Sequence, residues 1–99
     1  MGTREAKVEK HLCDEVEKIG GMCRKWVSPG HSGVPDQLVF FPLIIFLIEV
    51  KTLDGVVGPS QLREHKRLKE YHANVRVVYG ESGVDDFIDE CKKTLGIDD

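Results

Sequence analysis

Two stretches, Gly33-Val34-Pro35-Asp36 and Ile44-Ile45-Phe46-Leu47-Ile48-Glu49-Val50-Lys51, decide the fold of this chain. The run 44–48 is apolar, β-branched and aromatic, which is typical of a buried strand. A buried strand rarely ends in a carboxylate and an ammonium group, so the charged end needs a reason. Because residues two apart in a strand point the same way, Glu49 and Lys51 share a face with Ile45 and Leu47, while Val50 lies on the opposite face.

Asp36 opens a second apolar run that ends at Phe41, and Pro42-Leu43 separates this run from the strand over 44–51. The two runs predict an antiparallel hairpin that brings Asp36 beside Glu49. The turn has no glycine, so the pattern leaves the register of the hairpin open. Two carboxylates and a lysine at the rim of an apolar sheet can hold a divalent cation and direct a water molecule.

The periodicity of the remaining chain predicts an alternation of helices and strands. Val8, Leu12 and Val16 recur at helical spacing and indicate a helix over residues 4–19, which Gly20-Gly21 ends. Further along we expect a strand over 22–27 with a packed Trp26, loops over 28–33 and 53–58, a helix over 60–72 with Pro59 in its first turn, a strand over 75–79 and a helix over 83–95. A strand, helix, strand connection favours a parallel neighbour, so the order α-β-β-β-α-β-α predicts a small mixed sheet flanked by helices.

Size and composition limit the class of protein. Ninety-nine residues, 40% of them hydrophobic, predict a single small α/β domain over residues 1–99 with a modest core. The first 18 residues are charged, and the longest apolar run, 38–48, is broken by Pro42 and is too short to span a bilayer. We therefore expect a cytosolic protein without a signal peptide or a membrane segment. The separated cysteines are expected to be reduced thiols: Cys13, Cys23 and Cys91.

The net charge of −3 is unevenly distributed. Residues 81–99 hold seven acidic and two basic residues, whereas residues 1–80 hold twelve basic and ten acidic ones. Phosphate binding requires a local basic surface and not a basic total, so the charge is compatible with a nucleic-acid partner. Two groups of side chains can meet phosphates, with a solvated surface as the alternative: Arg24, Lys25 and His31 beside the 28–33 loop, and Arg63, Lys66, Arg67 and Lys69 on the 60–72 helix.

The order of these motifs resembles the VRR-NUC family of the PD-(D/E)xK nuclease superfamily. The likeness covers roughly residues 4–88 and is closest to small stand-alone phage and bacterial members. It is carried by Pro35-Asp36 and Glu49-Val50-Lys51, supported by Glu9, Gly20-Gly21, Ser28-Pro29-Gly30, Gln61 and Glu64-His65. The resemblance implies a restriction-endonuclease-like core, a Mg²⁺ or Mn²⁺ cofactor and hydrolysis of DNA phosphodiester bonds.

The resemblance also implies a role for each site residue. Asp36 and Glu49 would bind the metal together with the carbonyl oxygen of Val50, and Glu9 would complete the shell directly or through water; Glu5, one turn earlier, is its rival. Four residues would be catalytic: Asp36, Glu49, Lys51 and Gln61. Lys51 would orient the attacking water and stabilise the negative transition state, and Gln61 would hydrogen-bond water or phosphate. His65 and His72 are expected to be packing or surface residues.

The function favoured by the sequence is a structure-specific endonuclease that resolves Holliday (four-way) junctions as a homodimer. A junction must be cut in two strands while one chain offers one site, so a two-fold dimer would supply the second. The interface is expected within residues 75–95. A nuclease for other branched, nicked or single-stranded DNA remains the alternative within the enzyme class.

A non-catalytic nucleic-acid-binding module of the same fold is the alternative from another class. A salt bridge from Glu49 or Asp36 to Lys51, closing the end of a strand, would explain these residues without catalysis. The intact set of two acids and a lysine argues against that alternative, because a binding module does not need all three.

Overall fold

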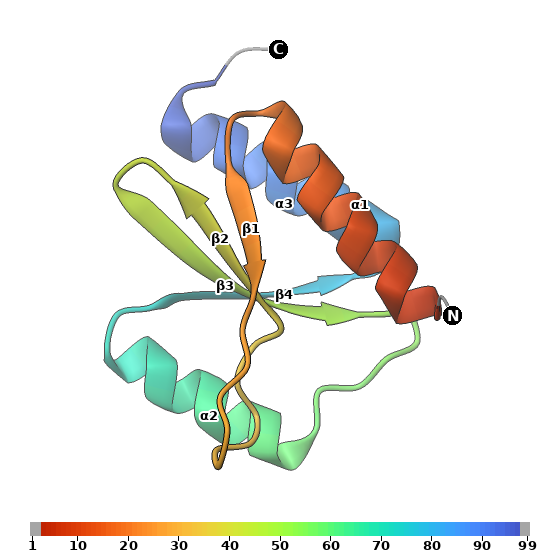
Figure 1. Cartoon of the computed structure of the whole chain (residues 1–99), viewed down its shortest axis with the longest axis vertical. Helices are drawn as coiled ribbons and strands as arrows, with labels where there is room; N and C mark the ends of the chain where they lie inside the picture. Colours follow the sequence, from red (N-terminus) through yellow and green to blue (C-terminus); the bar gives the residue numbers. More distant parts are fainter. Residues whose placement is uncertain (1–2, 98–99) are drawn as a thin grey trace.

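The structure is a computed structural model that describes residues 3–97. Helices and strands follow the predicted α-β-β-β-α-β-α order (Figure 1). Their bounds are α1 Arg4–Lys18, β1 Met22–Lys25, β2 Gln37–Phe41, β3 Ile44–Lys51, α2 Pro59–Glu70, β4 Asn74–Tyr79 and α3 Gly80–Leu95. The predicted fold class, a small mixed sheet with flanking helices, is confirmed.

The four strands form one sheet in the order β1-β2-β3-β4. β1, β2 and β3 pair antiparallel, and β4 lies parallel to β3, as expected for strands joined through a helix. Phe41 pairs with Ile44 across the turn, and Gln37 pairs with Ile48 at the other end of the hairpin. This register continues to Asp36 and Glu49, so the predicted hairpin forms although its turn has no glycine. Leu43 closes the turn at φ 69°.

The helices lie on both faces of the sheet, with α1 and α3 side by side on one face and α2 on the other (Figure 1). The core lies between the sheet and the α1–α3 layer. Its most enclosed residues include Leu12 and Val16 of α1, Phe46, Ile48 and Val50 of β3, and Val84 and Cys91 of α3. The other layer is thin, because His65 is the one buried residue within α2. Polar contacts described below hold α2 in place.

Three element ends differ from the sequence-based expectation by two residues or more. α3 begins at Gly80 and not at residue 83, because Gly80 adopts φ 67° and turns the chain directly from β4 into the helix. β1 ends at Lys25, but the N–H of the half-buried Trp26 still donates to the carbonyl oxygen of Asp36 at 2.9 Å. α2 ends at Glu70 and not at His72.

Two further expectations can be compared with the structure. Within residues 3–97, no helix has both the length and the apolar character needed to cross a membrane. The three cysteines are free thiols, with Cys23 and Cys91 buried and Cys13 half-buried.

His72 holds the left-handed position that follows α2. Its φ is 66°, and the N–H of the next residue, Ala73, donates to the carbonyl oxygen of Leu68 at 3.1 Å, which forms a Schellman motif. Glycine takes this conformation without the steric cost that a Cβ imposes. We expect His72→Gly to raise the free energy of unfolding by about 1 kcal/mol, measured by urea denaturation. His72→Ala is the control, because it removes the exposed imidazole but keeps the Cβ; equal midpoints for the two variants would contradict the prediction.

Candidate active site

The predicted site residues meet where β2 begins and β3 ends. Asp36 directly precedes β2, and its Oδ2 accepts a hydrogen bond from the N–H of Val50 at 2.8 Å. This bond exists because the hairpin register sets Asp36 across from Glu49, one residue away from Val50. The carboxylate of Asp36 is thereby fixed to the end of the central strand.

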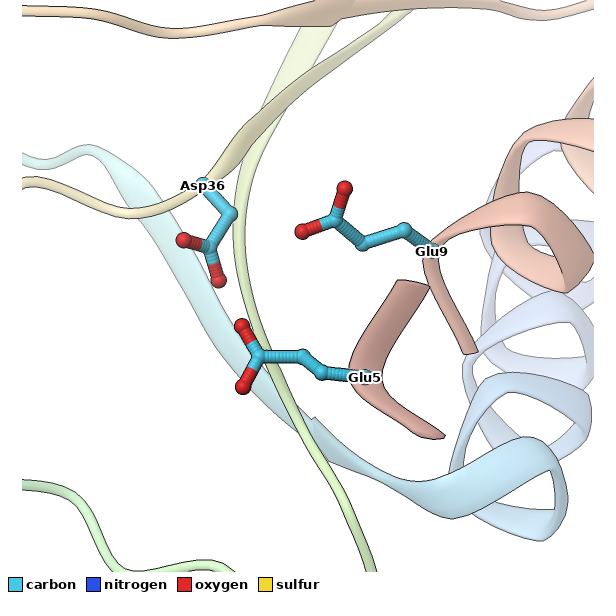
Figure 2. Close-up of side chains that lie close together, drawn as sticks. All are labelled: Glu5, Glu9 and Asp36. Atoms are coloured by element: carbon cyan, nitrogen blue, oxygen red, sulfur yellow. The ribbon is translucent and has the colours of Figure 1, made fainter. Parts of the chain in front are cut away.

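Two glutamates of α1 point at Asp36. The carboxylates of Glu5, Glu9 and Asp36 turn toward one another (Figure 2), and an oxygen of each lies within 4.8 Å of the others. Glu5 and Glu9 are one helical turn apart and therefore project from the same side of α1. The sequence argument treated these two glutamates as rivals, whereas the structure brings both to Asp36.

Glu9 has two further polar neighbours. The Nε2 of Gln37 donates to Oε2 of Glu9 at 3.4 Å, and the Nζ of Lys25 lies 3.8 Å from the same oxygen. Lys25 is one of the cations that the sequence analysis assigned to phosphate contact. It is exposed at the edge of the acidic cluster, so it offsets only part of the negative charge there.

Glu49 is buried, with 1% of its surface exposed. Its Oε2 accepts a hydrogen bond from Nε2 of Gln61 at 3.0 Å and lies 3.6 Å from Nζ of Lys51. Its Oε1 has no hydrogen-bond partner among the described residues, although Nε2 of His65 lies 3.5 Å away and is likewise buried without one. A buried oxygen left in this state is costly, so the site is incomplete without a further partner.

The electrostatics of the site follow from burial. Burial, and after it the negative charge of Asp36, raises the pKa of Glu49 to about 8, although the ammonium of Lys51 acts in the opposite direction. Burial also lowers the pKa of His65, with a smaller contribution from Lys69, so its imidazole is neutral at neutral pH. Lys51 is therefore the cation that faces Glu49.

Gln61 is held at both ends of its amide. Its Oε1 accepts the N–H of Gly58 at 2.9 Å, which satisfies a free donor at the start of α2, and its Nε2 donates to Glu49. The sequence analysis expected contact with water or phosphate, and one amide N–H is left for that purpose. Its role in the described contacts is to orient Glu49 and to tie α2 to β3.

His65 is the site residue that sequence reasoning missed. It follows Gln61 by four residues and therefore lies on the same side of α2. That spacing was visible in the sequence, but a histidine on the apolar side of a helix is more often a packing residue. Only the position of α2 over the end of β3 shows that His65 faces Glu49.

The residues present suit a hard divalent cation. Such ions prefer carboxylate and carbonyl oxygens. The three clustered carboxylates supply negative charge that Lys25 offsets only in part, and Oε1 of Glu49 adds a ligand oxygen that has no hydrogen-bond partner among the described residues. The arrangement combines clustered acids, a lysine in contact with one of them and an amide that fixes its orientation. It is suited to hydrolysis assisted by a metal ion.

Known proteins resemble this chain in sequence and in structure. No protein-family model matches it. Over 67 residues it is 55% identical to "Putative nuclease p44" of Acyrthosiphon pisum secondary endosymbiont phage 1, a match that covers 66% of this chain and 71% of the phage protein. A solved structure described as a VRR_NUC domain has a TM-score of 0.82 and 37% identity, covering 89% of this chain and 97% of the domain.

A second solved structure shares the fold alone. It is Hjc, a Holliday junction resolvase from the archaeon Archaeoglobus fulgidus, with a TM-score of 0.58 and 19% identity over 75% of this chain and 66% of the resolvase.

The buried carboxylate of Glu49 makes the stability of the metal-free protein depend on pH. Its pKa is raised in the folded chain, so the folded state binds the proton more tightly than the unfolded state does, and stability is lost as pH rises from the unfolded value toward 8. We expect Glu49→Gln, which removes the charge, to be more stable than the wild type at pH 8 in EDTA by about 1–3 kcal/mol, and nearly equal to it at pH 5.

Thermal unfolding at both pH values measures this difference. Glu17→Gln is the matched control, because Glu17 is an exposed glutamate of α1, and it should track the wild type. A gap between Glu49→Gln and the wild type that stays constant from pH 5 to pH 8 would contradict the buried charge.

Proposed function

Because the chain belongs to the VRR-NUC nuclease family, we propose that it is a metal-dependent, structure-specific DNA endonuclease that resolves four-way junctions as a homodimer. The observation that carries this proposal is the convergence of Glu5, Glu9 and Asp36 beside the buried pair of Glu49 and Lys51. A salt bridge that merely closed a strand would not need the two glutamates of α1. The proposed location is the cytoplasm of a bacterial or phage-infected cell.

The proposed metal site uses oxygen donors from three elements. Asp36, Glu49, the carbonyl oxygen of Val50 and Glu9 would hold the ion, and Glu5 is close enough to Asp36 to take part. When bound, Mg²⁺ or Mn²⁺ would supply a water of lowered pKa and would offset negative charge on the phosphate.

The chain's own groups would position the reaction. Lys51 has 14% of its side chain exposed, so its ammonium is shielded by protein and yet reachable by a phosphate oxygen. It would orient the attacking water and stabilise the negative charge of the transition state. Gln61 would keep Glu49 in one orientation, and its remaining N–H would face water or phosphate. Asp36 is already oriented by the N–H of Val50.

The homodimer is proposed from an exposed apolar surface on the β2–β3 hairpin. α2 covers only part of its face of the sheet. On the part of that face that the hairpin forms, Phe40 pairs with Ile45 and Leu38 pairs with Leu47. Ile45 is 45% exposed and Leu43 is fully exposed at the tip. The groove that contains these residues is lined by apolar side chains together with His72 and Asn74, and its described lining has no Asp, Glu, Lys or Arg. A mainly apolar surface of this kind can meet a copy of itself without repulsion between like charges, and it offers DNA phosphates no Lys or Arg.

We propose the hairpin in place of the interface that the sequence analysis expected within residues 75–95. The apolar side of α3, formed by Val84, Phe87, Ile88 and Cys91, is already buried within the chain. This helix therefore offers a second copy less apolar surface than the hairpin does.

Substitutions at the site separate metal binding from chemistry. Asp36→Asn and Lys51→Met are both expected to reduce cleavage of DNA by at least about 100-fold, since each removes a charge that acts on the transition state. Calorimetry with Mn²⁺ should show lost binding for Asp36→Asn and retained binding for Lys51→Met. Glu9→Gln should weaken cleavage more than Glu5→Gln does, with Glu17→Gln as the control. Full activity of Asp36→Asn with metal present would overturn the proposed site.

Oligomeric state and substrate choice test the resolvase proposal. Light scattering at micromolar concentration should give about twice the 11.2 kDa chain mass. Ile45→Asp should give a folded monomer that no longer makes paired incisions across a four-way junction, whereas Val56→Asp, at an exposed loop valine, should remain a dimer. A wild-type monomer that nicks junctions once, and no faster than flap or linear DNA, would refute the resolvase proposal and leave the nuclease.

A further inference from the structure

The two faces of the molecule carry opposite charge. α1 has four cations and five carboxylates, and α3 has two cations and five carboxylates, so the layer they form has a balance of −4. α2 lies on the opposite face of the sheet (Figure 1). It has four cations and two carboxylates, a balance of +2. A polyanion is repelled by the first face and attracted by the second, although the whole chain is acidic.

A groove runs along the basic face between α2 and the loop over 28–33. Its lining includes His31 and Ser32 of the loop and Ser60, Arg63, Lys66 and Arg67 of α2. Ser60 and Arg63 are three residues apart, and Lys66 and Arg67 follow Arg63 by three and four, so these side chains lie in a stripe along one side of the helix. The stripe offers two guanidinium groups, an ammonium group and a hydroxyl to the same groove.

Two contacts fix the loop against α2. Gly33 has a φ of 90°, and a Cβ there would lie 2.5 Å from the carbonyl oxygen of Ser60, so the backbones meet more closely than any other residue allows. Nε2 of His31 lies 2.7 Å from Oε1 of Glu64, whose side chain is only 12% exposed. The carboxylate of Glu64 is therefore engaged and largely covered. Glu70 is an exposed carboxylate at the far end of the lining, so the groove presents Arg63, Lys66 and Arg67 against that one exposed acid.

The groove begins next to the active site. Ser60, which lines the groove, directly precedes Gln61, which donates to Glu49. From Ser60 to Arg67 the helix advances about 10 Å, and successive charges of one DNA strand lie about 3.4 Å apart along its axis. The stripe is thus long enough to meet roughly three consecutive phosphates.

We propose that this groove binds the phosphates of one DNA strand next to the bond that is cut, with Arg63 and Arg67 as the main contacts; the inference rests on the proposed nuclease function. A guanidinium group can make two parallel hydrogen bonds to a phosphate, which fixes the backbone more firmly than a lysine does. The DNA therefore approaches from the α2 face, and α1 takes part only through the end of the helix that carries Glu5 and Glu9.

The experiment compares two double variants that change net charge equally. Arg63→Gln/Arg67→Gln removes the proposed contacts, and Lys10→Gln/Lys18→Gln removes two exposed cations of the acidic layer. Binding of a fluorescent four-way junction is measured by anisotropy in EDTA at several salt concentrations. The arginine variant should bind about 10–100-fold more weakly and reduce the slope of log affinity against log salt by about 2, while the lysine variant stays within about twofold of wild type. Calorimetry with Mn²⁺ should be unchanged in both variants.

Each contrary outcome has a distinct meaning. Equal losses in the two variants would show an effect of total charge and would overturn the groove. An arginine variant that binds and cuts as the wild type does would overturn the groove and leave the nuclease proposal standing. Displacement of the DNA by polyglutamate with the same dependence on the two arginines would make the groove a general anion site and overturn its assignment to DNA. A wild-type protein that binds no DNA at all would refute the proposed function itself.

Discussion

The structure depends on one costly feature, the carboxylate of Glu49 buried at the end of the central strand. A carboxylate that is removed from water needs polar partners in the protein, and here it has them on one side only. Gln61 donates to Oε2, and the ammonium of Lys51 lies near the same oxygen. The other oxygen, Oε1, faces the buried imidazole of His65 at 3.5 Å. The carboxylate of Asp36 adds repulsion from the neighbouring strand. Such an arrangement is poor for the stability of the isolated chain and suitable for capturing a cation.

The same carboxylate explains how α2 is attached. A helix that buries a single residue gains little from apolar packing, yet α2 lies firmly over the end of β3. Gln61 bonds both to Glu49 and to the helix start at Gly58, His65 faces Glu49, and Gly33 brings the neighbouring loop into contact with the helix backbone. The position of α2, and of the basic groove along it, is thus set by the polar groups of the active site.

Segregation of charge lets an acidic chain carry a basic surface. The carboxylates of α3 and most of those of α1 lie in the layer that covers the core, on the far side of the sheet from α2. The exceptions are Glu5 and Glu9, which sit at the end of α1 that reaches Asp36. These two glutamates thus lie where we propose that a cation binds. The overall charge of −3 says little about the charge of the face that we propose to bind DNA.

The sequence by itself determined the order of the elements and the mixed sheet, and it predicted a hairpin that brings Asp36 beside Glu49. These features rest on the short-range periodicity of strands and helices, whereas the register of the hairpin was left open by a turn without glycine and was settled by the structure. The ends of two helices differ from the prediction because Gly80 and His72 adopt left-handed conformations that depend on their surroundings. As a result α3 starts earlier, and α2 ends earlier, than the sequence predicted.

Only the tertiary structure decided that Glu5 and Glu9 both reach Asp36 and that His65 faces Glu49. Helical spacing states which residues share a side of a helix, but the rotation and position of that helix against a strand more than ten residues away are set by packing of the whole core, which no local pattern contains.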